Sequence, residues 1–476
     1  MILTALAVLM IHAANIIKYF KPKLFMICTF FFINFGKKNI MFHSESTRFL
    51  EKNRALGEID PRIYTEIIGE NKVENLINMA ALLNGKEWAH VNSTFHGGGV
   101  AEMLRSVVPI AKGLGIDTKW YCIEGEDDFY SITKRFHNII QGVDQKFTLE
   151  DLFETYIKTN KANFEDKTIK ADFTVVHDPQ PCGSIVHGSY DSKMVWRCHI
   201  DTSEANEMIW NFLLPYINNY DSVVFSMKEF VKEGIKKPVY QIVPSIDPLT
   251  KKNRQRSEDE ALDSLDSLFK EYNIDPERPI VLAVSRYDIH KNQKTIIQSF
   301  KELKKDSAIH KLNPQLIIVG NSASDDPEGM AMYNEILNVI DGDKDIYPLL
   351  NIPDNDENIG ALMKLAKVFI HISTKEGFGL VVTEALWQGT PVIGSNVGGI
   401  VLQVVPAKTG YLVEPFDIER IVGFTKYMLL NEEDREKLGL QAIEHVRENF
   451  LITSLVEKYI KLMRFLLGTD YPYFKI

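Results

Sequence analysis

Two glutamates on either side of a glycine-rich segment are the first residues of this chain with a recognisable chemistry. Glu376 is followed by Gly377-Phe378-Gly379-Leu380, and Glu384 comes eight positions after Glu376. The segment follows an apolar run and leads into a helical pattern, so its backbone N–H groups would attract an anion at a helix N-terminus. The two carboxylates could then accept hydrogen bonds from the hydroxyl groups of a sugar and of a ribose. An acidic loop followed by an ordinary helical glutamate is the alternative interpretation.

A pair of basic residues follows another apolar run, at residues 280–285. Arg286 has a planar guanidinium group, and Lys291, five positions later, carries a compact ammonium group. Both groups could converge on one diphosphate at the end of a strand. A solvated pair of charges on a loop is the alternative interpretation.

Three consecutive glycines, Gly97, Gly98 and Gly99, follow the apolar run at 88–93 and open a helical pattern. Backbone N–H groups without side chains at a helix N-terminus form an anion site through hydrogen bonding and through the helix dipole. A tight turn from strand to helix with no ligand would use glycine as well.

The overall composition excludes several classes of protein. The chain has 476 residues, of which 45% are hydrophobic and 25% charged, as in ordinary globular proteins. Its length suggests two or three domains. The formal net charge of −10 provides no basic field for nucleic acid, so we expect no nucleic-acid partner. The four cysteines lie far apart, which favours reduced thiols in a cytoplasmic protein over disulfides or a zinc site.

The elements that must position these residues are short apolar runs that alternate with helical patterns. We expect strands at 88–93, 172–177, 195–199 and 222–226 in the first half, and at 280–285, 315–320, 368–372 and 391–394 in the second. Runs that are apolar throughout are typical of parallel strands covered by helices on both faces. The chain is therefore expected to be α/β and doubly wound, with ligands bound outside the carboxyl ends of the strands, between two domains.

A charged stretch with several prolines, which contains a short helical pattern near 261–269, separates the two halves. It predicts the following organisation: a hydrophobic leader at 1–40, an N-terminal Rossmann-like domain at 41–250, a linker at 251–275, a second Rossmann-like domain at 276–445, and a C-terminal helix at 446–476.

The first forty residues differ in composition from the rest. They contain five lysines and no acidic residue, and apolar residues dominate 1–17 and 24–35. Each of these runs is shorter than the roughly 20 residues that a membrane-spanning helix needs. Three interpretations stay open: a translation start at Met41, a hydrophobic membrane anchor, and a core element. The protein would be cytoplasmic in the first case and membrane-anchored in the second.

Taken together, the motifs resemble those of retaining glycosyltransferases with the GT-B fold, which consists of two facing Rossmann-like domains. The glutamate pair with its Gly-Phe-Gly-Leu segment, the basic pair Arg286 and Lys291, and the glycine loop at 97–99 occur in the order typical of that family. Asn396-Val397-Gly398-Gly399-Ile400, ahead of Gly410-Tyr411-Leu412-Val413, continues the resemblance.

The first half resembles one group within that family. His90-Val91-Asn92-Ser93-Thr94, His177-Asp178-Pro179-Gln180-Pro181 and Trp196-Arg197-Cys198-His199-Ile200-Asp201 are similar to segments of the glucosyl-transferring trehalose synthases and of the retaining trehalose phosphorylases. The resemblance covers about residues 55 to 465. It also implies that the C-terminal helices pack back across the two domains.

The resemblance implies that a nucleoside diphosphate glucose is the donor and binds to the second domain. Glu384 would bind the ribose hydroxyls, whereas Glu376 and the N–H groups of Gly377 to Gly379 would bind the glucose hydroxyls. Arg286 and Lys291 would stabilise the diphosphate as the glycosidic bond breaks. The remaining donor-binding residues would be Gly97, Gly98, Gly99, Ile352, Phe378 and Leu380. Ile352 belongs to Leu349–Pro353, where the family binds the nucleotide base through backbone groups.

The first domain would bind the acceptor sugar. His177 is implied as a catalytic residue, with Arg286, Lys291 and Glu376, because its imidazole or carbonyl group would support the oxocarbenium-like centre. Asp178, Arg197 and His199 would hold the acceptor glucose. The acceptor hydroxyl would attack from the same face as the departing phosphate, without the carboxylate nucleophile of retaining glycosidases. No metal and no other cofactor is expected to be required, and relatives of this kind often form dimers.

The expected reaction is the transfer of glucose from the nucleotide sugar to free glucose, giving α,α-trehalose. A retaining trehalose phosphorylase, which uses inorganic phosphate, needs the same anion-binding groups and is the nearest alternative. An epimerase on the same scaffold would need acid–base carboxylates beside the sugar, and a non-catalytic sugar-nucleotide sensor is a further alternative.

Overall fold

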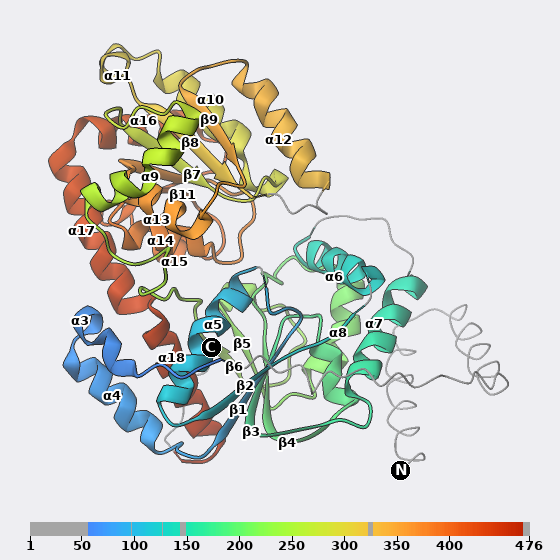
Figure 1. The fold of residues 1–476 in the computed structure, drawn as a ribbon. Helices are drawn as coiled ribbons and strands as arrows, with labels where there is room; N and C mark the ends of the chain where they lie inside the picture. Colours follow the sequence, from blue (N-terminus) through green and yellow to red (C-terminus); the bar gives the residue numbers. More distant parts are fainter. Residues whose placement is uncertain (1–55, 97, 126, 143–148, 322–326, 470–476) are drawn as a thin grey trace.

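The computed structural model describes residues 56–96, 98–125, 127–142, 149–321 and 327–469. The leader expected at 1–40, Gly97 and residues 470–476 of the expected C-terminal helix lie outside these residues. Two parallel sheets, each with helices around it, form the two halves of the molecule (Figure 1). The predicted fold class, two Rossmann-like α/β domains, is confirmed.

The first sheet has six parallel strands in the order β2-β1-β3-β4-β5-β6. Its strands are β1 (Glu87–Asn92), β2 (Asp117–Cys122), β3 (Thr168–His177), β4 (Ser189–Arg197), β5 (Ser222–Phe225) and β6 (Val239–Gln241). The strand order reverses between β1 and β3, and such a switch point is where ligands bind in open α/β sheets.

The second sheet also has six parallel strands, in the order β12-β11-β10-β7-β8-β9. Its strands are β7 (Ile280–Val284), β8 (Gln315–Gly320), β9 (Ile346–Leu350), β10 (Val368–His371), β11 (Val392–Ser395) and β12 (Gly410–Val413). Counted within the domain, this is the 3-2-1-4-5-6 order of dinucleotide-binding folds, with its switch point between β7 and β10.

Helices precede, connect and follow the strands (Figure 1). Those of the first domain are η2 (Pro61–Tyr64), α3 (Thr65–Ile68), α4 (Glu70–Ala81), α5 (Gly98–Gly113), α6 (Asp127–Ile140), α7 (Leu149–Phe164), η3 (Cys182–Val186), α8 (Glu207–Ile217) and η4 (Lys228–Phe230). The second half of the chain contains α9 (Glu258–Tyr272), η5 (Ile289–Lys291), α10 (Gln293–Leu303), α11 (Ser307–Leu312), α12 (Pro327–Ile340), α13 (Asn355–Leu365), α14 (Leu380–Trp387), α15 (Ile400–Gln403), α16 (Ile418–Leu430), α17 (Glu432–Asn449) and α18 (Ile452–Leu466). No described helix is long and apolar enough to cross a membrane.

Both faces of the second sheet are buried, which explains why its strands are apolar throughout. Along β7, Val281 and Ala283 pack into one hydrophobic cluster, whereas Leu282 and Val284 pack into the cluster on the opposite face. Successive side chains of a strand point to opposite faces, so a sheet covered on both sides needs apolar residues at every position.

The structure contains all eight strands expected from the sequence, with bounds shifted by up to six residues, and four more. The additional strands are β2, β6, β9 and β12. These four are the edge strands of the two sheets. An edge strand is partly exposed and carries polar residues, glycine or proline, as in Asp117 and Lys119 of β2, Pro348 of β9 and Gly410 of β12. The search for continuous apolar runs therefore missed them.

The segment expected as a linker at 251–275 contains helix α9. Ser257 and Glu260 form a capping box at its start, which satisfies backbone N–H groups of the first turn. Leu265 and Phe269 pack into the hydrophobic core of the second domain. The irregular connection between the domains is therefore shorter than expected, because α9 is part of the second domain.

The last two helices connect the domains again. Ala442 and Val446 of α17 pack in the core of the second domain, whereas Leu455 and Tyr459 of α18 pack in the core of the first. Figure 1 shows α17 and α18, in red, running from the upper domain to the lower one. The prediction that C-terminal helices pack back across the domains is confirmed, although residues 446–449 still belong to α17.

Candidate active site

The switch point of the second sheet brings Lys291 and Glu376 into contact. Lys291 ends the short helix η5 after β7, and Glu376 lies in the loop after the adjacent strand β10. The Lys291 Nζ atom is 2.6 Å from Oε2 of Glu376. The side chains are only 15% and 12% exposed, so the two charges form a nearly buried ion pair. Removing one partner of such a pair typically costs about 3–5 kcal/mol.

Two further groups hold the Glu376 carboxylate. His371 Nε2 lies 2.8 Å from Oε2, and Ser373 Oγ donates to the same oxygen at 3.3 Å. Burial alone would raise the pKa of Glu376, but Lys291 and His371 outweigh it and hold that pKa well below its usual value. Glu376 is therefore a fixed, ionised acceptor.

The two glycines after Glu376 lie where a side chain would have little room. Gly379 has φ +79° and directly precedes the first residue of α14, a left-handed conformation that favours glycine. The loop at Gly398 and Gly399 packs against the loop that carries Glu376. A Cβ atom at Gly398 would lie 1.8 Å from the Glu376 carbonyl oxygen. Gly399 N–H donates to the Gly377 carbonyl at 3.2 Å. The backbone around Glu376 is thus fixed by close packing of two loops.

Glu384 lies on α14, behind this loop, and is also buried. Lys252, from the connection between the domains, places Nζ 2.6 Å from Glu384 Oε1 and 2.7 Å from Oε1 of Glu102 on α5. The pKa of Glu384 is raised, chiefly by burial and also by Glu102, whereas Lys252 opposes both effects.

Arg286 and Ile352 lie at the same end of the second sheet but are placed differently. Arg286 is 65% exposed, and its guanidinium group pairs with Asp288 at 3.2 Å, not with Glu376. Ile352 is buried in the domain core just after β9. The Asn351 N–H of that loop donates to the Gly320 carbonyl at 3.0 Å. The Ile352 side chain is therefore not available to contact a base, and any contact at this position would use its backbone.

The switch point of the first sheet carries three imidazoles in a row. His90 lies in β1, His177 is the last residue of β3, and His199 follows β4. His90 Nδ1 lies 3.0 Å from His177 Nε2, and His177 Nδ1 lies 3.1 Å from His199 Nε2. Consecutive rings are stacked, with centroids 5.2 and 5.4 Å apart. Tyr459 of α18 meets the His90 ring edge-on.

Burial keeps these imidazoles neutral. It lowers the pKa of His90 to about 3. The pKa of His177 is lowered well below its usual value by burial, by the two neighbouring histidines and by Arg197. Burial and Arg197 lower the pKa of His199 as well. A neutral imidazole has one donor and one acceptor nitrogen, so each contact along the row shares a single proton.

The other two expected acceptor-binding residues adjoin this row. Asp178 has φ +64°, and its Oδ1 accepts a hydrogen bond from the His199 N–H at 2.8 Å. Burial raises the pKa of Asp178 to about 6, although this bond and Arg197 oppose the shift. Arg197 is fully buried, and its guanidinium group approaches Ser226 Oγ at 3.4 Å. The structure thus gathers His177, Asp178, Arg197 and His199 in one cluster.

The two domains meet at these residues. A Cβ atom at Gly377 would lie 3.0 Å from the His199 carbonyl oxygen, and one at Gly99 would lie 3.2 Å from Cδ1 of Leu380. Gly98, with φ +73°, and Gly99 are the first two residues of α5. The N-termini of α5 and α14 therefore approach each other from opposite domains, next to the histidine row. The roles proposed for the site residues from the sequence stay predictions, but the structure brings most of them together.

Four residues of this region were not singled out from the sequence. They are His90, Lys252, His371 and Lys375. The Lys375 ammonium group donates to the Gln141 carbonyl of the first domain at 2.6 Å and lies 3.4 Å from Glu204. His90 belonged to a motif that carried the resemblance but was given no role, and Lys252 lay in the charged stretch interpreted as a linker. The contacts of His90, Lys252 and Lys375 join distant segments, so sequence spacing gave no signal for them, whereas His371 lies only five positions before Glu376.

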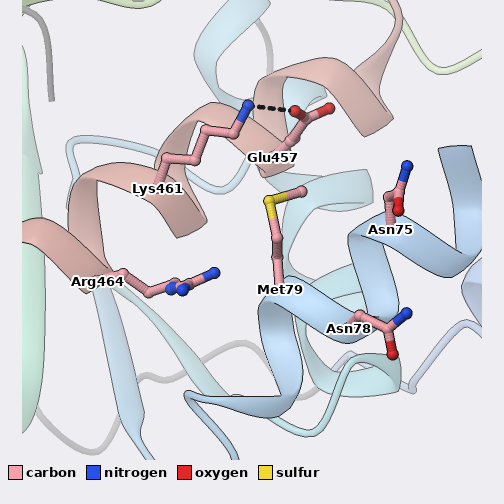
Figure 2. Close-up of a pocket in the computed structure, with 6 residues that line it drawn as sticks. All are labelled: Asn75, Asn78, Met79, Glu457, Lys461 and Arg464. Atoms are coloured by element: carbon pink, nitrogen blue, oxygen red, sulfur yellow. Dashed lines mark hydrogen bonds and ion pairs between the residues drawn. The ribbon is translucent and has the colours of Figure 1, made fainter. Parts of the chain in front are cut away.

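The described residues show no arrangement for a metal ion, and the pocket of Figure 2 lies apart from the candidate site. Among the described residues, no group of three or more His, Cys, Asp and Glu side chains is arranged to hold a metal ion. A pocket of about 380 Å³ lies between α4 and α18, lined by Asn75, Asn78, Met79, Glu457, Lys461 and Arg464 (Figure 2). None of the candidate site residues lines this pocket.

Comparison with known proteins links the chain to sugar-transferring enzymes. The family model of the trehalose synthase N-terminal domain matches residues 90–232, and that of the group 1 glycosyl transferases matches residues 265–445. A trehalose synthase from Thermococcus litoralis is 39% identical over 403 residues, which cover 84% of this chain and 95% of that protein. One from Rubrobacter xylanophilus is 36% identical over 426 residues, 87% of this chain and 98% of that protein.

More distant similarities are of two kinds. A trehalose phosphorylase from Grifola frondosa is 28% identical over 435 residues, covering 81% of this chain but 58% of that protein. Among solved structures, a UDP-forming α,α-trehalose-phosphate synthase from Burkholderia xenovorans, in complex with glucose-6-phosphate, has a TM-score of 0.64 at 13% identity. Its alignment covers 80% of this chain and all of that chain. The structural likeness supports the two-domain fold alone.

Proposed function

Because the chain belongs to the trehalose synthase family of group 1 glycosyltransferases, we propose that it transfers glucose from a nucleoside diphosphate glucose to free glucose. The transfer retains the configuration at the anomeric carbon and yields α,α-trehalose. The trehalose-related transfer rests on the family, whereas the donor and the stereochemistry are the proposal.

One observation carries the choice of donor. Two largely buried carboxylates, Glu376 in the loop before α14 and Glu384 in the second turn of that helix, lie near its N-terminus at the switch point of a sheet with dinucleotide-binding strand order. Such a helix end binds phosphate, and a carboxylate on each side suits the hydroxyls of a sugar and of a ribose. A donor with hydroxyl groups at both ends of a diphosphate matches this arrangement.

The proposed reaction breaks the bond between the glucose anomeric carbon and the diphosphate oxygen. Lys291, Arg286 and the helix N-termini would stabilise the negative charge that develops on the leaving diphosphate, and one well-placed donor of this kind is worth about 2.7–4 kcal/mol. The hydroxyl oxygen of the acceptor glucose forms the new bond from the same face. Its proton passes to the leaving phosphate oxygen, so no protein carboxylate is needed as a nucleophile.

The first domain would position the acceptor and the reacting sugar. Neutral His177 would lie near the anomeric carbon without adding a positive charge to an oxocarbenium-like centre. Asp178 and His199 would bind hydroxyls of the acceptor glucose. Since His199 contacts Gly377 of the second domain, the acceptor would be held next to the donor sugar. We also propose a cytoplasmic location, which the free thiols of Cys122, Cys182 and Cys198 support.

A retaining trehalose phosphorylase is the second candidate, favoured by the 28% identical relatives of that name. It would replace the nucleoside diphosphate by inorganic phosphate and would leave Glu384 without a ribose.

The test uses the full chain with labelled glucose and either ADP-, UDP- or GDP-glucose, or glucose 1-phosphate. We expect labelled α,α-trehalose, identified by its anomeric NMR signals, with at least one nucleotide sugar. EDTA should leave the rate unchanged, because fixed cations and helix N-termini replace a metal. Trehalose formation with glucose 1-phosphate alone would contradict the proposal and favour the phosphorylase.

A further inference from the structure

Lys252 connects both domains at the carboxylate assigned to the ribose. Its ammonium group lies between Glu384 of α14 and Glu102 of α5, at 2.6 and 2.7 Å. The Lys252 side chain is 13% exposed and that of Glu384 is 4% exposed, whereas Glu102 is 42% exposed. Lys252 and Glu384 thus form the buried part of the cluster, and Glu102 forms its outer part.

The backbone that carries Lys252 is fixed to α14 itself. Trp387 Nε1 donates to the Asn253 carbonyl at 2.8 Å, and Gln255 Nε2 donates to the Trp387 carbonyl at 2.6 Å. A Cβ atom at Gly360 would lie 2.2 Å from the Lys252 carbonyl oxygen, so α13 packs directly on this segment. Trp387, at the C-terminal end of α14, thus holds the segment that carries Lys252, and the Lys252 side chain contacts Glu384 of the same helix.

Lys252 is the positive charge that opposes the rise of the Glu384 pKa. Burial raises the pKa of the Glu384 carboxyl, Glu102 raises it further, and Lys252 opposes both. Burial lowers the pKa of Lys252, but the two carboxylates outweigh it and raise that pKa above its usual value. Without Lys252, two carboxylates would face each other with no counter-charge, so the pKa of Glu384 would rise further and its carboxylate would lose the group that orients it.

We propose that Lys252 is a positioning residue for the nucleoside part of the donor: it holds Glu384 as an aligned acceptor for the ribose hydroxyls. This inference rests on the proposed function, because Glu384 has a ribose to bind only if the donor is a nucleotide sugar. Lys252 binds one oxygen of the carboxylate, Oε1, and a carboxylate has acceptor sites on both oxygens. The ribose would therefore bind beside Lys252 and would not displace it.

The test compares binding of nucleoside diphosphates with and without ribose hydroxyls. Binding of ADP, UDP and GDP, and of their 2′,3′-dideoxy analogues, is measured by calorimetry for wild type, Lys252→Met, Glu102→Gln and the control Lys270→Met. Lys270 is 76% exposed on α9 and pairs only with a neighbour on its own helix, Asp266. Donor and glucose KM values are measured in parallel.

We expect the wild type to bind its nucleotide at least tenfold more tightly than the dideoxy analogue. Lys252→Met should reduce this discrimination to about twofold or less and raise the donor KM about tenfold, with the glucose KM unchanged. Glu102→Gln keeps the contact between Lys252 and Glu384, so it should retain the discrimination. If Lys252 only tied the domains together, Glu102→Gln would resemble Lys252→Met, and neither change would depend on the ribose hydroxyls.

Each outcome decides the inference. Unchanged discrimination in folded Lys252→Met would overturn it while leaving the proposed function intact. A wild-type protein that binds no nucleoside diphosphate would overturn both. If Lys252→Met does not fold, the double variant Glu102→Gln/Lys252→Met removes one of the opposed carboxylates together with the ammonium group. It is expected to show the same loss of discrimination, and retained discrimination there would overturn the inference.

Discussion

The carboxyl ends of the two sheets face each other with different chemistry. The first domain presents the row of His90, His177 and His199, whose imidazoles are kept neutral by burial. Arg197 is buried beside this row, whereas the second domain presents buried ion pairs: Lys291 with Glu376, and Lys252 with Glu384. Both sets lie at or beside a switch point, so the same backbone topology carries two electrostatic environments.

The difference matches the two kinds of substrate that the proposed reaction brings together. A neutral acceptor sugar needs hydrogen-bond donors and acceptors without net charge, which neutral imidazoles supply. An anionic diphosphate needs fixed cations, and the sugar and ribose on either side of it need fixed acceptors. Net charge therefore says little about this site: a chain with a net charge of −10 can bind an anion with a few well-placed groups.

Among the proposed changes, replacing Lys291 of the second domain should have the largest effect on the rate of transfer. Lys291→Ala is expected to lower kcat by about 10²–10³-fold, because one donor to a developing anion is worth about 2.7–4 kcal/mol. His371 and Ser373 would still hold Glu376, so the protein should fold. Steady-state kinetics check this, with Lys294→Ala as the control, since Lys294 pairs with Glu335 on the surface. A loss below tenfold would contradict the role of Lys291.

The neutral face should respond to acid before the charged face does. The pKa of His90 is about 3 in the folded protein and about 6.5 when unfolded, so the unfolded chain binds more protons between these values. The stabilising effect of neutral His90 is complete above pH 6.5 and is lost as the pH falls toward 3, by about 1.4 kcal/mol per pH unit. Glu376, with a lowered pKa, loses its contribution only below its usual value near 4.5.

Urea unfolding at pH 5.0 to 6.5, compared between wild type and His90→Asn, separates the contribution of His90 from that of Asp178, whose pKa of about 6 lies in the same range. His90→Asn keeps a donor near the position of Nδ1 but removes one titrating group. The free energy of unfolding of this variant should depend less steeply on pH than that of wild type, by about 0.7 kcal/mol per pH unit near pH 6.5 and approaching about 1.4 near pH 5.0. Equal slopes for the two proteins would show that His90 is not held neutral.

The contact between the two faces at Lys375 should matter least. Lys375 is 33% exposed, donates to the Gln141 carbonyl and lies near Glu204. Lys375→Met is expected to raise the KM of the donor about two- to fivefold with kcat nearly unchanged, because partly exposed contacts contribute roughly 0.2–1 kcal/mol. Glu204→Gln is the matched variant and should change KM less. A tenfold loss of kcat would instead place Lys375 in the chemical step.

The fold was predictable where strands are buried on both sides and not where they form edges. The expected strands at 280–285 and 315–320 correspond to β7 and β8, which are covered on both faces. β6 and β12 were not predicted. An edge strand has one partner and an exposed side, so its sequence need not be apolar. Likewise, a short helical pattern near 261–269 lies within a stretch interpreted as a linker, and the structure extends it to α9, whose one apolar stripe packs on the second domain.

The site was predictable to the extent that its residues follow strands. Lys291, Glu376 and His177 stand at strand ends, where parallel topology brings them to one edge of a sheet. Lys252 and Glu102 do not, and their link to Glu384 depends on how the connecting segment folds back on α14. No local pattern encodes such a contact, since its residues are 132 to 282 positions from Glu384 in the sequence.

The two α/β domains, the trehalose-related family and most of the groups gathered at the candidate site could be predicted from the amino-acid sequence. Apolar periodicity and strand-end motifs are local properties, so they can be recognised from the sequence without the fold. Only the tertiary structure decided which charges are paired and which imidazoles share protons. Those properties depend on burial and on distances of about 3 Å between residues of different elements, and burial sets both the pKa of a group and the strength of its contacts.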